Sequence, residues 1–395
     1  MNDGRRLRVL LAPDSFKGSL SSAGVARALA EGWRKARPRD QLIVAPLADG
    51  GEGMLAAMAE TGGWEWRECL AHDPLGRPLV AHWLASSDGT RAAVELAEAS
   101  GLSKLPVDEP RNALAATTQG TGEVLRTVLD AGVRRIVMGV GGSATTDGGA
   151  GILRGLGAVL RGGGAHNLPG PVDGLSAVEL DGLDPRLAQV EMRVACDVTN
   201  PLLGDHGAAA VYAPQKGAWP QDVAALEAWL TQYADLLEAA SGVEARDRPG
   251  AGAAGGTAFG LMCLSSRLRS FELVPGVDLI MDEVGFDERL AGADLVITGE
   301  GQVDAQTAFG KTALGVAKRA AAAGVPCLAV AGKVAAEGAA ALASVGCVAV
   351  PILDRPLSLR DAMAGAPALL VSTGERLARL TATMAGVGSK EEATA

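Results

Sequence analysis

The sequence has few aromatic residues and no long apolar run, and each shortage excludes a class of protein. Phe, Trp and Tyr make up only 3% of the 395 residues, so the core must be built largely from Ala, Val and Leu. Few aromatics, no basic block and a formal net charge of −10 argue against nucleic-acid binding. No apolar stretch reaches the length of a membrane span without Gly, Pro or a charged residue, so no membrane partner is expected.

Cysteine and histidine patterns are also missing. The five cysteines are far apart and form no CxxC pair, which predicts free thiols in a reducing compartment. The first residues, MNDGRRLRVLLAPDS, contain too short an apolar run for a secretory signal, so we expect a cytoplasmic protein. There is no HExxH or Cys/His pattern and no GxSxG elbow, so neither a zinc site nor an α/β-hydrolase is indicated.

The sequence does contain an alternation of short apolar runs and helical periods. A chain of this length predicts two domains. Strands followed by polar or glycine-rich loops and then helices form a βαβ pattern, which predicts an α/β fold with a parallel sheet of flavodoxin or Rossmann type. The predicted strands of this kind cover residues 7–13, 42–47, 135–138, 294–298, 326–331 and 347–352.

The pattern changes in the middle of the chain. Residues 64–96 are typical of a β-meander, which we interpret as part of an inserted domain. Residues 208–212 resemble a strand of that insert. Residues 241–256, which are polar and then rich in Gly and Ala, are typical of a mobile loop or linker. The predicted domains are therefore a parallel-sheet domain of residues 1–63, 116–164 and 261–388, an inserted mixed α/β domain of residues 64–115 and 165–260, and a disordered tail of residues 389–395.

One glycine-rich stretch, GVGGSATTDGGAG at residues 139–151, stands where a predicted strand turns into a helix. Glycines there allow a ligand close to the backbone, and N–H groups at a helix start favour an anion. We interpret the stretch as a phosphate or carboxylate cradle with Asp147 near a metal or a transferred proton. The alternative is a tight turn in which Thr145, Thr146 or Asp147 caps the helix. The dinucleotide fingerprint Gly139-x-Gly141-x-x-Ala144 lacks the acidic residue that would bind a ribose.

Acidic residues recur where predicted strands end. Parallel neighbouring strands bring their carboxyl ends to one edge, so these acids are expected along one crevice. Carboxylates in glycine-rich loops suit Mg²⁺ that also contacts substrate phosphates, whereas any single acid is explained equally by a turn or a helix cap. The acids are Asp14, Asp49, Asp147, Glu300 and Asp304.

Three lysines lie in polar loops that contain glycine: Lys17, Lys216 and Lys311. Phosphoryl transfer requires positive charges of this kind to offset the negative charge of the phosphates. The sequence before Lys311 resembles the end of a phosphate loop, but Ala305 replaces the glycine of a true Walker motif. An ordinary exposed lysine is the alternative. Asp197 follows a predicted strand and could accept the proton of a substrate hydroxyl or form an Asx turn.

Together the motifs resemble the bacterial type I glycerate kinase family, over roughly residues 7–380. They are APDSFKGSLSS, LADGGEGM, ELAEASGL, ATTQGTGE, GVGGSATTDGGAG, ACDVTNPLLG, AVYAPQKGA, GAAGGTAFGL and TGEGQVDAQTAFGKTALGVA. The resemblance implies two α/β domains with the active site in the cleft between them. It also implies that ATP and Mg²⁺ are used to phosphorylate D-glycerate, usually at the 2-hydroxyl to give 2-phosphoglycerate.

For such a kinase we expect Asp197 or Asp304 to accept the proton, and Lys17 and Lys311 to neutralise charge. The metal ligands would be Asp49, Asp147 and Glu300. A glycerate 3-kinase, another small hydroxy-acid kinase and a non-catalytic hydroxy-acid sensor remain alternatives, and the oligomeric state, a homodimer included, stays open. Substrate or phosphate contacts are expected from Asp14, Ser15, Gly50, Gly51, Gly141, Gly142, Ser143, Thr145, Thr146, Asn200, Lys216, Gly255, Gly256 and Gly299.

Overall fold

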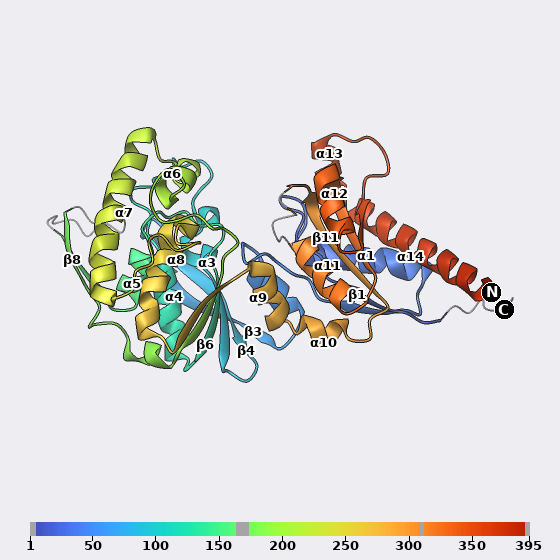
Figure 1. The fold of residues 1–395 in the computed structure, drawn as a ribbon, viewed down its shortest axis with the longest axis horizontal. Coiled ribbons are helices and arrows are strands. Elements are labelled where there is room, and N and C mark those ends of the chain that lie inside the picture. Colours follow the sequence, from blue (N-terminus) through green and yellow to red (C-terminus); the bar gives the residue numbers. More distant parts are fainter. Residues whose placement is uncertain (1–4, 163–173, 306, 308–311, 392–395) are drawn as a thin grey trace. The chain divides into compact units, whose positions relative to one another are not determined.

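The structure, a computed structural model, describes residues 5–162, 174–305, 307 and 312–391 (Figure 1). The chain divides into two compact units. Unit 1 contains Met1–Asp49, Ala56–Gly62 and Ile280–Ala395, and unit 2 contains Gly50–Leu55 and Gly63–Leu279. All five cysteines are unbonded, as predicted. Within the described ranges, no helix is long and apolar enough to cross a membrane.

Unit 1 is built on a five-stranded parallel sheet. The strand order is β13 (Cys347–Pro351), β12 (Cys327–Val334), β11 (Leu295–Val303), β1 (Arg8–Leu11) and β2 (Gln41–Val44). Counted from β2, this is the flavodoxin-like order, and it confirms the parallel sheet predicted from both ends of the chain. In such sheets the strand order reverses beside the first strand, here between β1 and β11, and ligands bind at the carboxyl ends of the strands at that point.

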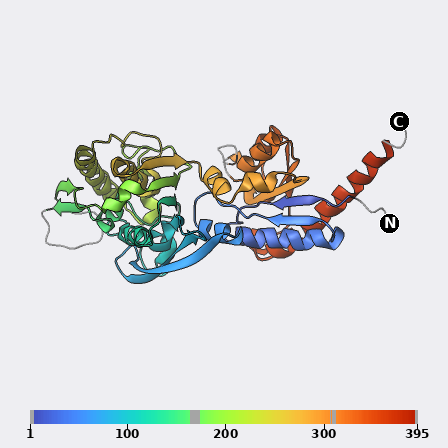
Figure 2. The ribbon, with the colours of Figure 1, turned by 90° about the horizontal axis from the view of Figure 1, so that it is seen from below.

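Helices cover the unit 1 sheet, and two of them, α1 (Ser22–Ala36) and α14 (Ala366–Glu391), lie side by side (Figure 2). Helix α1 begins where the Ser21 hydroxyl accepts a hydrogen bond from the Gly24 N–H. A Cβ on Gly32 would overlap the Val371 carbonyl, so glycine permits this close helix packing. The other helices that contribute residues to unit 1 are α2 (Met54–Glu60), α9 (Gly276–Glu283), α10 (Phe286–Leu290), α11 (Thr312–Ala322), α12 (Ala336–Ala343) and α13 (Leu359–Ala364).

Unit 2 has a mixed six-stranded sheet. Its order is β10 (Ser270–Val274), β9 (Glu191–Ala195), β6 (Arg135–Gly139), β5 (Arg91–Glu95), β4 (Pro78–Ser86) and β3 (Trp64–His72). Strands β3, β4 and β5 pair antiparallel as the meander prediction required, but β5 continues in parallel with β6, and β6 with β9. The carboxyl ends of β5, β6, β9 and β10 therefore share one edge.

The helices of unit 2 are drawn in Figure 1, and the core of the unit consists mainly of Leu, Val and Ala and also includes Trp83, Tyr233 and Phe259. They are α3 (Ala97–Ser100), α4 (Gln119–Asp130), α5 (Ala150–Gly155), α6 (Ala208–Tyr212), α7 (Pro220–Ser241) and α8 (Ala253–Leu264). A separate hairpin joins β7 (Val159–Gly162) and β8 (Leu175–Glu179), and short 3₁₀ turns occur at η1 (Leu102–Lys104), η2 (Pro185–Gln189), η3 (Pro214–Lys216) and η4 (Ser265–Arg267).

The observed units differ from the predicted domains. Residues 116–164 and 261–279 belong to unit 2, although we expected them in the domain that carries both chain ends. The reason is strand pairing: β6 lies between β5 and β9, and its Arg135 is in register with both Arg91 and Glu191. A βα pattern predicts a parallel strand but does not reveal which of two sheets the strand will join.

Several local predictions also need correction. Residues 208–212 form α6 rather than a strand, since a short apolar run does not separate the two. The expected linker ends in a buried helix, α8, which begins at Ala253. Strand β11 continues to Val303, through residues predicted as a loop. Helix α14 extends to Glu391, into the tail predicted to be disordered.

Candidate active site

The loop that follows β1 in unit 1 (residues 12–19, the β1 loop) carries a carboxylate at the carboxyl edge of the sheet. The Asp14 N–H donates to the Gly299 carbonyl at 2.8 Å, which extends the pairing of β1 with β11. The Asp14 carboxylate accepts hydrogen bonds from the Thr312 hydroxyl at 2.6 Å and from the Ser15 N–H at 2.5 Å. Burial, with the negative charge of Asp49 adding to it, raises the pKa of Asp14 to about 6. A cation at this pair would relieve the repulsion.

Two further predicted acids belong to β11 and the turn after it. Glu300 is 7% exposed, and its carboxylate accepts a hydrogen bond from the Thr307 hydroxyl at 3.1 Å. The same hydroxyl accepts the Asp304 N–H at 3.1 Å, and the Asp304 carboxylate accepts from the Gln302 side chain at 2.6 Å. Thr307 thus ties Glu300 to the backbone of Asp304.

Unit 1 therefore brings four of the predicted acids to three adjacent strands. Asp14 and Asp49 follow β1 and β2, Glu300 lies within β11, and Asp304 comes directly after it. Lys17 is exposed in the β1 loop, next to Gly18 with a φ of +72°. Lys311 lies outside the described residues. Among the residues that the structure does describe, no three His, Cys, Asp or Glu side chains gather as a metal cluster. Of the three predicted metal ligands, Asp49 and Glu300 belong to unit 1 and Asp147 belongs to unit 2.

Asp147 belongs to unit 2 and is buried in the loop that follows β6 (residues 140–149, the β6 loop). Its carboxylate accepts hydrogen bonds from the Thr118 N–H at 2.7 Å, the Thr118 hydroxyl at 2.8 Å and the Gly151 N–H at 3.1 Å. These bonds join the starts of α4 and α5. The geometry matches the capping alternative considered for this residue.

Lys216 is 2% exposed, and its ammonium group is directed at the β6 loop. It donates to the Ser143 hydroxyl at 2.8 Å and to the Thr145 carbonyl at 2.5 Å. Burial lowers the pKa of Lys216 to about 7, although the negative charge of Asp147 opposes the shift. The contact with substrate that the sequence predicted stays a prediction, and in the structure the ammonium bonds to a hydroxyl and a carbonyl of the β6 loop.

The β6 loop is also packed against the start of α8. Gly255 and Gly256 have φ values of +68° and +84°, and a Cβ on Gly255 would overlap the Thr145 carbonyl. The hydroxyls of Thr145 and Thr146 are buried and have no hydrogen-bond partner within the described chain. Buried hydroxyls normally have a partner, so these two mark the loop as a place where a polar ligand would fit.

The stretch from Gly50 to Leu55 packs against the ends of β6 and β9, as part of unit 2. Gly50 has a φ of +78°, and a Cβ on it would overlap Ala195 at the end of β9. The Cα of Gly51 lies 2.6 Å from where a Cβ on Gly141 would be, so position 141 also requires glycine. These close contacts explain why the predicted glycines surround one edge of the sheet.

Glu95 is the last residue of β5 and is a further acid at the end of a strand. It was not named among the acids expected from the sequence, although the rule that selected the other strand-end acids applies to it as well. Its carboxylate accepts the Leu55 N–H at 2.7 Å and the Gly53 N–H at 3.3 Å. Burial raises the pKa of Glu95 to about 7, with Glu98 and Glu52 adding to the shift. Glu95 thus fixes the backbone of the segment that contains Gly50 and Gly51.

Asp197 follows β9 and is exposed, and one carboxylate oxygen accepts the Gly276 N–H at 2.8 Å. Because β9 pairs with β6, Asp197 and the β6 loop lie at the carboxyl ends of neighbouring strands. Asn200 is held differently: its amide donates to the His206 carbonyl at 2.9 Å and accepts from the Tyr212 hydroxyl at 2.8 Å. Asn200 therefore stabilises the loop that carries Asp197.

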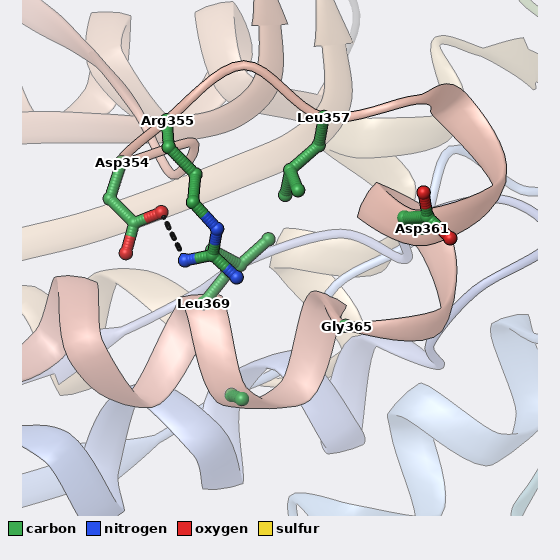
Figure 3. Close-up of a pocket in the computed structure, with 7 residues that line it drawn as sticks. Asp354, Arg355, Leu357, Asp361, Gly365 and Leu369 are labelled. Carbon is green, nitrogen blue, oxygen red and sulfur yellow. Dashed lines mark hydrogen bonds and ion pairs between the residues drawn. The ribbon is translucent and has the colours of Figure 1, made fainter.

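A small pocket of about 200 Å³ lies elsewhere in unit 1 (Figure 3). Its Arg355 guanidinium is paired with Asp354 at 2.8 Å, and Leu357 and Leu369 form part of its lining. None of the predicted site residues that the structure describes lines it. The pocket is therefore separate from both groups of predicted residues.

Comparison with known proteins agrees with the motifs. A model of the glycerate kinase family matches residues 9–382. The chain is 43% identical to the glycerate kinase of Bacillus subtilis (strain 168) over 317 residues, which are 80% of this chain and 82% of the relative. It is 42% identical to the glycerate 2-kinase of Escherichia coli (strain K12) over 315 residues, 79% of this chain and 81% of the relative.

A solved structure is similar as well. The crystal structure of a protein described as putative glycerate kinase 2 from Salmonella typhimurium LT2 superimposes with a TM-score of 0.81 at 38% sequence identity. The match covers 96% of this chain and 99% of that chain. The chain belongs to the glycerate kinase family and is a kinase.

Proposed function

We propose that the protein transfers the γ-phosphoryl group of ATP to the 2-hydroxyl of D-glycerate and releases 2-phosphoglycerate and ADP. The 2-hydroxyl is proposed as the phosphorylated group because the chain is 42% identical to the Escherichia coli protein named glycerate 2-kinase. The unbonded cysteines support the cytoplasmic location that we also propose.

Asp197 and the β6 loop would bind the acceptor. The hydroxyl of D-glycerate is a poor nucleophile until its proton has an acceptor, and an exposed carboxylate can take that proton in the transition state. The acceptor's carboxylate would contact the β6 loop, whose Thr145 and Thr146 hydroxyls have no partner within the described chain. N–H and hydroxyl groups can bind an anion through their dipoles, without a positively charged side chain in direct contact with it.

The β1 loop and its neighbours would bind the nucleotide phosphates. The exposed Lys17 supplies a positive charge, which matters because the net charge of −10 repels an anionic substrate from the protein as a whole. The donor set fits Mg²⁺, since Asp14 has a pKa of about 6 beside the charge of Asp49. Mg²⁺, when bound, offsets phosphate charge, and Asp14 and Asp49 would hold it.

In the proposed reaction the 2-hydroxyl oxygen forms a bond to the γ-phosphorus as the bond to the β–γ bridging oxygen breaks. ADP leaves with that oxygen, and the hydroxyl proton passes to Asp197. Lys17 offsets the negative charge on the transferred group. Asp304, which comes directly after β11 of unit 1, is the alternative proton acceptor.

Phosphorus NMR of the product made from D-glycerate and ATP tests this function. We expect the resonance of 2-phosphoglycerate together with an equal amount of ADP. The resonance of 3-phosphoglycerate would move the reaction to the other hydroxyl. Binding of D-glycerate without ADP release would instead support a hydroxy-acid sensor, and a panel of small hydroxy acids would reveal another preferred acceptor.

A further inference from the structure

Lys216 is unusual because a lysine side chain is almost never this buried unless it has partners that match its charge or hydrogen bonds. Its side chain is 2% exposed, and both acceptors recorded for its ammonium, the Ser143 hydroxyl and the Thr145 carbonyl, belong to the β6 loop. The loop and the lysine are more than 70 residues apart in sequence. The lysine thus links two distant segments at one peptide of the loop.

The same peptide is confined by the start of α8. Gly255 lies so close to the Thr145 carbonyl that only glycine fits, and its own carbonyl accepts the Gly148 N–H at 3.0 Å. Ala254, Gly255 and Gly256 all have positive φ values, and for Ala254 the value of +54° is strained. Such strain persists only where the surroundings hold the backbone firmly, which indicates a loop with one defined shape.

This clamp accounts for the Thr145 backbone, but it leaves the Thr145 and Thr146 hydroxyls without a partner in the described chain. A buried hydroxyl without a partner costs stability, which a polar ligand would recover. The neighbouring strand β9 carries Asp197 at its end, and adjacent strands are about 4.8 Å apart. In a 2-hydroxy acid the carboxylate is bonded to the carbon that bears the hydroxyl, so both groups fit such a spacing.

We propose that Lys216 is a positioning residue, whose ammonium holds the Ser143–Thr145 backbone so that the Thr145 and Thr146 hydroxyls bind the carboxylate of the hydroxy-acid acceptor. The inference rests on the proposed function, and it assigns the β6 loop to the acceptor rather than to ATP. Lys216 itself does not contact the substrate. Its removal should therefore weaken acceptor binding selectively.

The test compares Lys216→Met with the wild-type enzyme and with Lys318→Met, an exposed lysine on α11. Met matches the four-atom stem of the lysine side chain and removes the ammonium donors. We expect the KM for D-glycerate to rise at least about tenfold while the KM for ATP changes less than about twofold, as loss of a charged hydrogen bond predicts. Equal rises in both KM values, or an unchanged KM for D-glycerate, would overturn the proposal.

Hydrogen exchange of the peptide that covers residues 143–149 gives a readout that does not depend on activity. We expect faster exchange there in Lys216→Met and unchanged exchange in Lys318→Met. If the wild-type enzyme does not phosphorylate D-glycerate, the proposed function fails while this measurement still tests the clamp. Unchanged exchange in an active Lys216→Met enzyme would contradict the clamp alone.

If Lys216→Met does not fold, Thr145→Val and Thr146→Val test the same site. Valine has the shape of threonine, and the lost hydroxyls have no partner in the described chain, so both variants should fold. We expect at least one of them to raise the KM for D-glycerate several-fold without changing the KM for ATP. Unchanged KM values for D-glycerate in both variants would overturn the proposed carboxylate site.

Discussion

The β1 loop of unit 1 and the β6 loop of unit 2 both follow a buried parallel strand, yet they use charge in opposite ways. The β1 loop presents Asp14, which is partly buried with a raised pKa, and Lys17, which is exposed. In the β6 loop the charged residue is Asp147, which is 1% exposed and bonded to backbone and hydroxyl groups. One loop has an exposed charge at Lys17, and the other uses a buried charge to hold its own shape.

The contrast suggests why two loops of similar composition suit different partners. Exposed charges and a carboxylate pair are appropriate to polyphosphate and a divalent cation. The β6 loop is held in place by hydrogen bonds of Asp147 and Lys216. It offers hydroxyl and N–H groups instead, which suit a small organic anion. The following predictions test this division, from the largest expected effect to the smallest.

Asp197→Asn tests the acceptor side and should have the largest effect. Asn keeps an oxygen that can accept the Gly276 N–H, so the fold should persist, but an amide cannot take up the proton. We expect kcat to fall about 100-fold or more with little change in the KM for ATP. Steady-state kinetics together with thermal unfolding measure both points.

Asp304→Asn is the matched comparison in unit 1. If Asp197→Asn retains near-wild-type kcat and Asp304→Asn does not, the proton acceptor lies in unit 1, and the division between the loops fails. Recovery of Asp197→Asn by additional Mg²⁺ would make Asp197 a metal ligand instead.

Lys17→Ala tests the nucleotide side. We expect kcat to fall at least about tenfold because the variant loses a charge that offsets the transferred phosphoryl group. The melting temperature should not change, since the Lys17 side chain is exposed. Wild-type kcat at an unchanged melting temperature would identify Lys17 as an ordinary surface lysine.

Glu95→Gln tests a buried charge of unit 2 and should affect stability rather than chemistry. The pKa of Glu95 is about 7 in the folded protein against an ordinary value of 4.5, chiefly because of burial. Between these values the folded protein holds a proton that the unfolded chain has released. The free energy of unfolding of the wild type therefore decreases as the pH rises through this window, by up to about 3 kcal/mol for this group.

Because glutamine does not titrate, the stability of Glu95→Gln relative to wild type should increase from pH 5 to pH 8. Chemical denaturation at several pH values measures the difference. A difference that stays constant across this range would mean that Glu95 ionises in the folded protein as readily as in the unfolded chain.

Much of unit 1 was predictable from local sequence. Short apolar runs predicted β1, β12 and β13 within about three residues of their observed bounds, because a strand covered on both faces must be apolar throughout. The same rule predicted the start of β11 but not its extension to Val303. The rule that acids at strand ends meet at one sheet edge also selected Asp14, whose N–H bonds to the carbonyl of Gly299 beside Glu300. Parallel strands impose this, since their carboxyl ends meet at the same edge.

By itself, then, the sequence determined the α/β class, the family motifs and the chemistry available at each strand end, since these depend on residues close together in the chain. Only the tertiary structure decided that β6 joins the unit 2 sheet, that Asp147 is a buried cap, and that Lys216 holds the β6 loop. These outcomes depend on strand pairing and burial between segments far apart in sequence. Lys17 and Lys216 stand in similar loop contexts in the sequence, and only burial separates an exposed charge from an internal clamp.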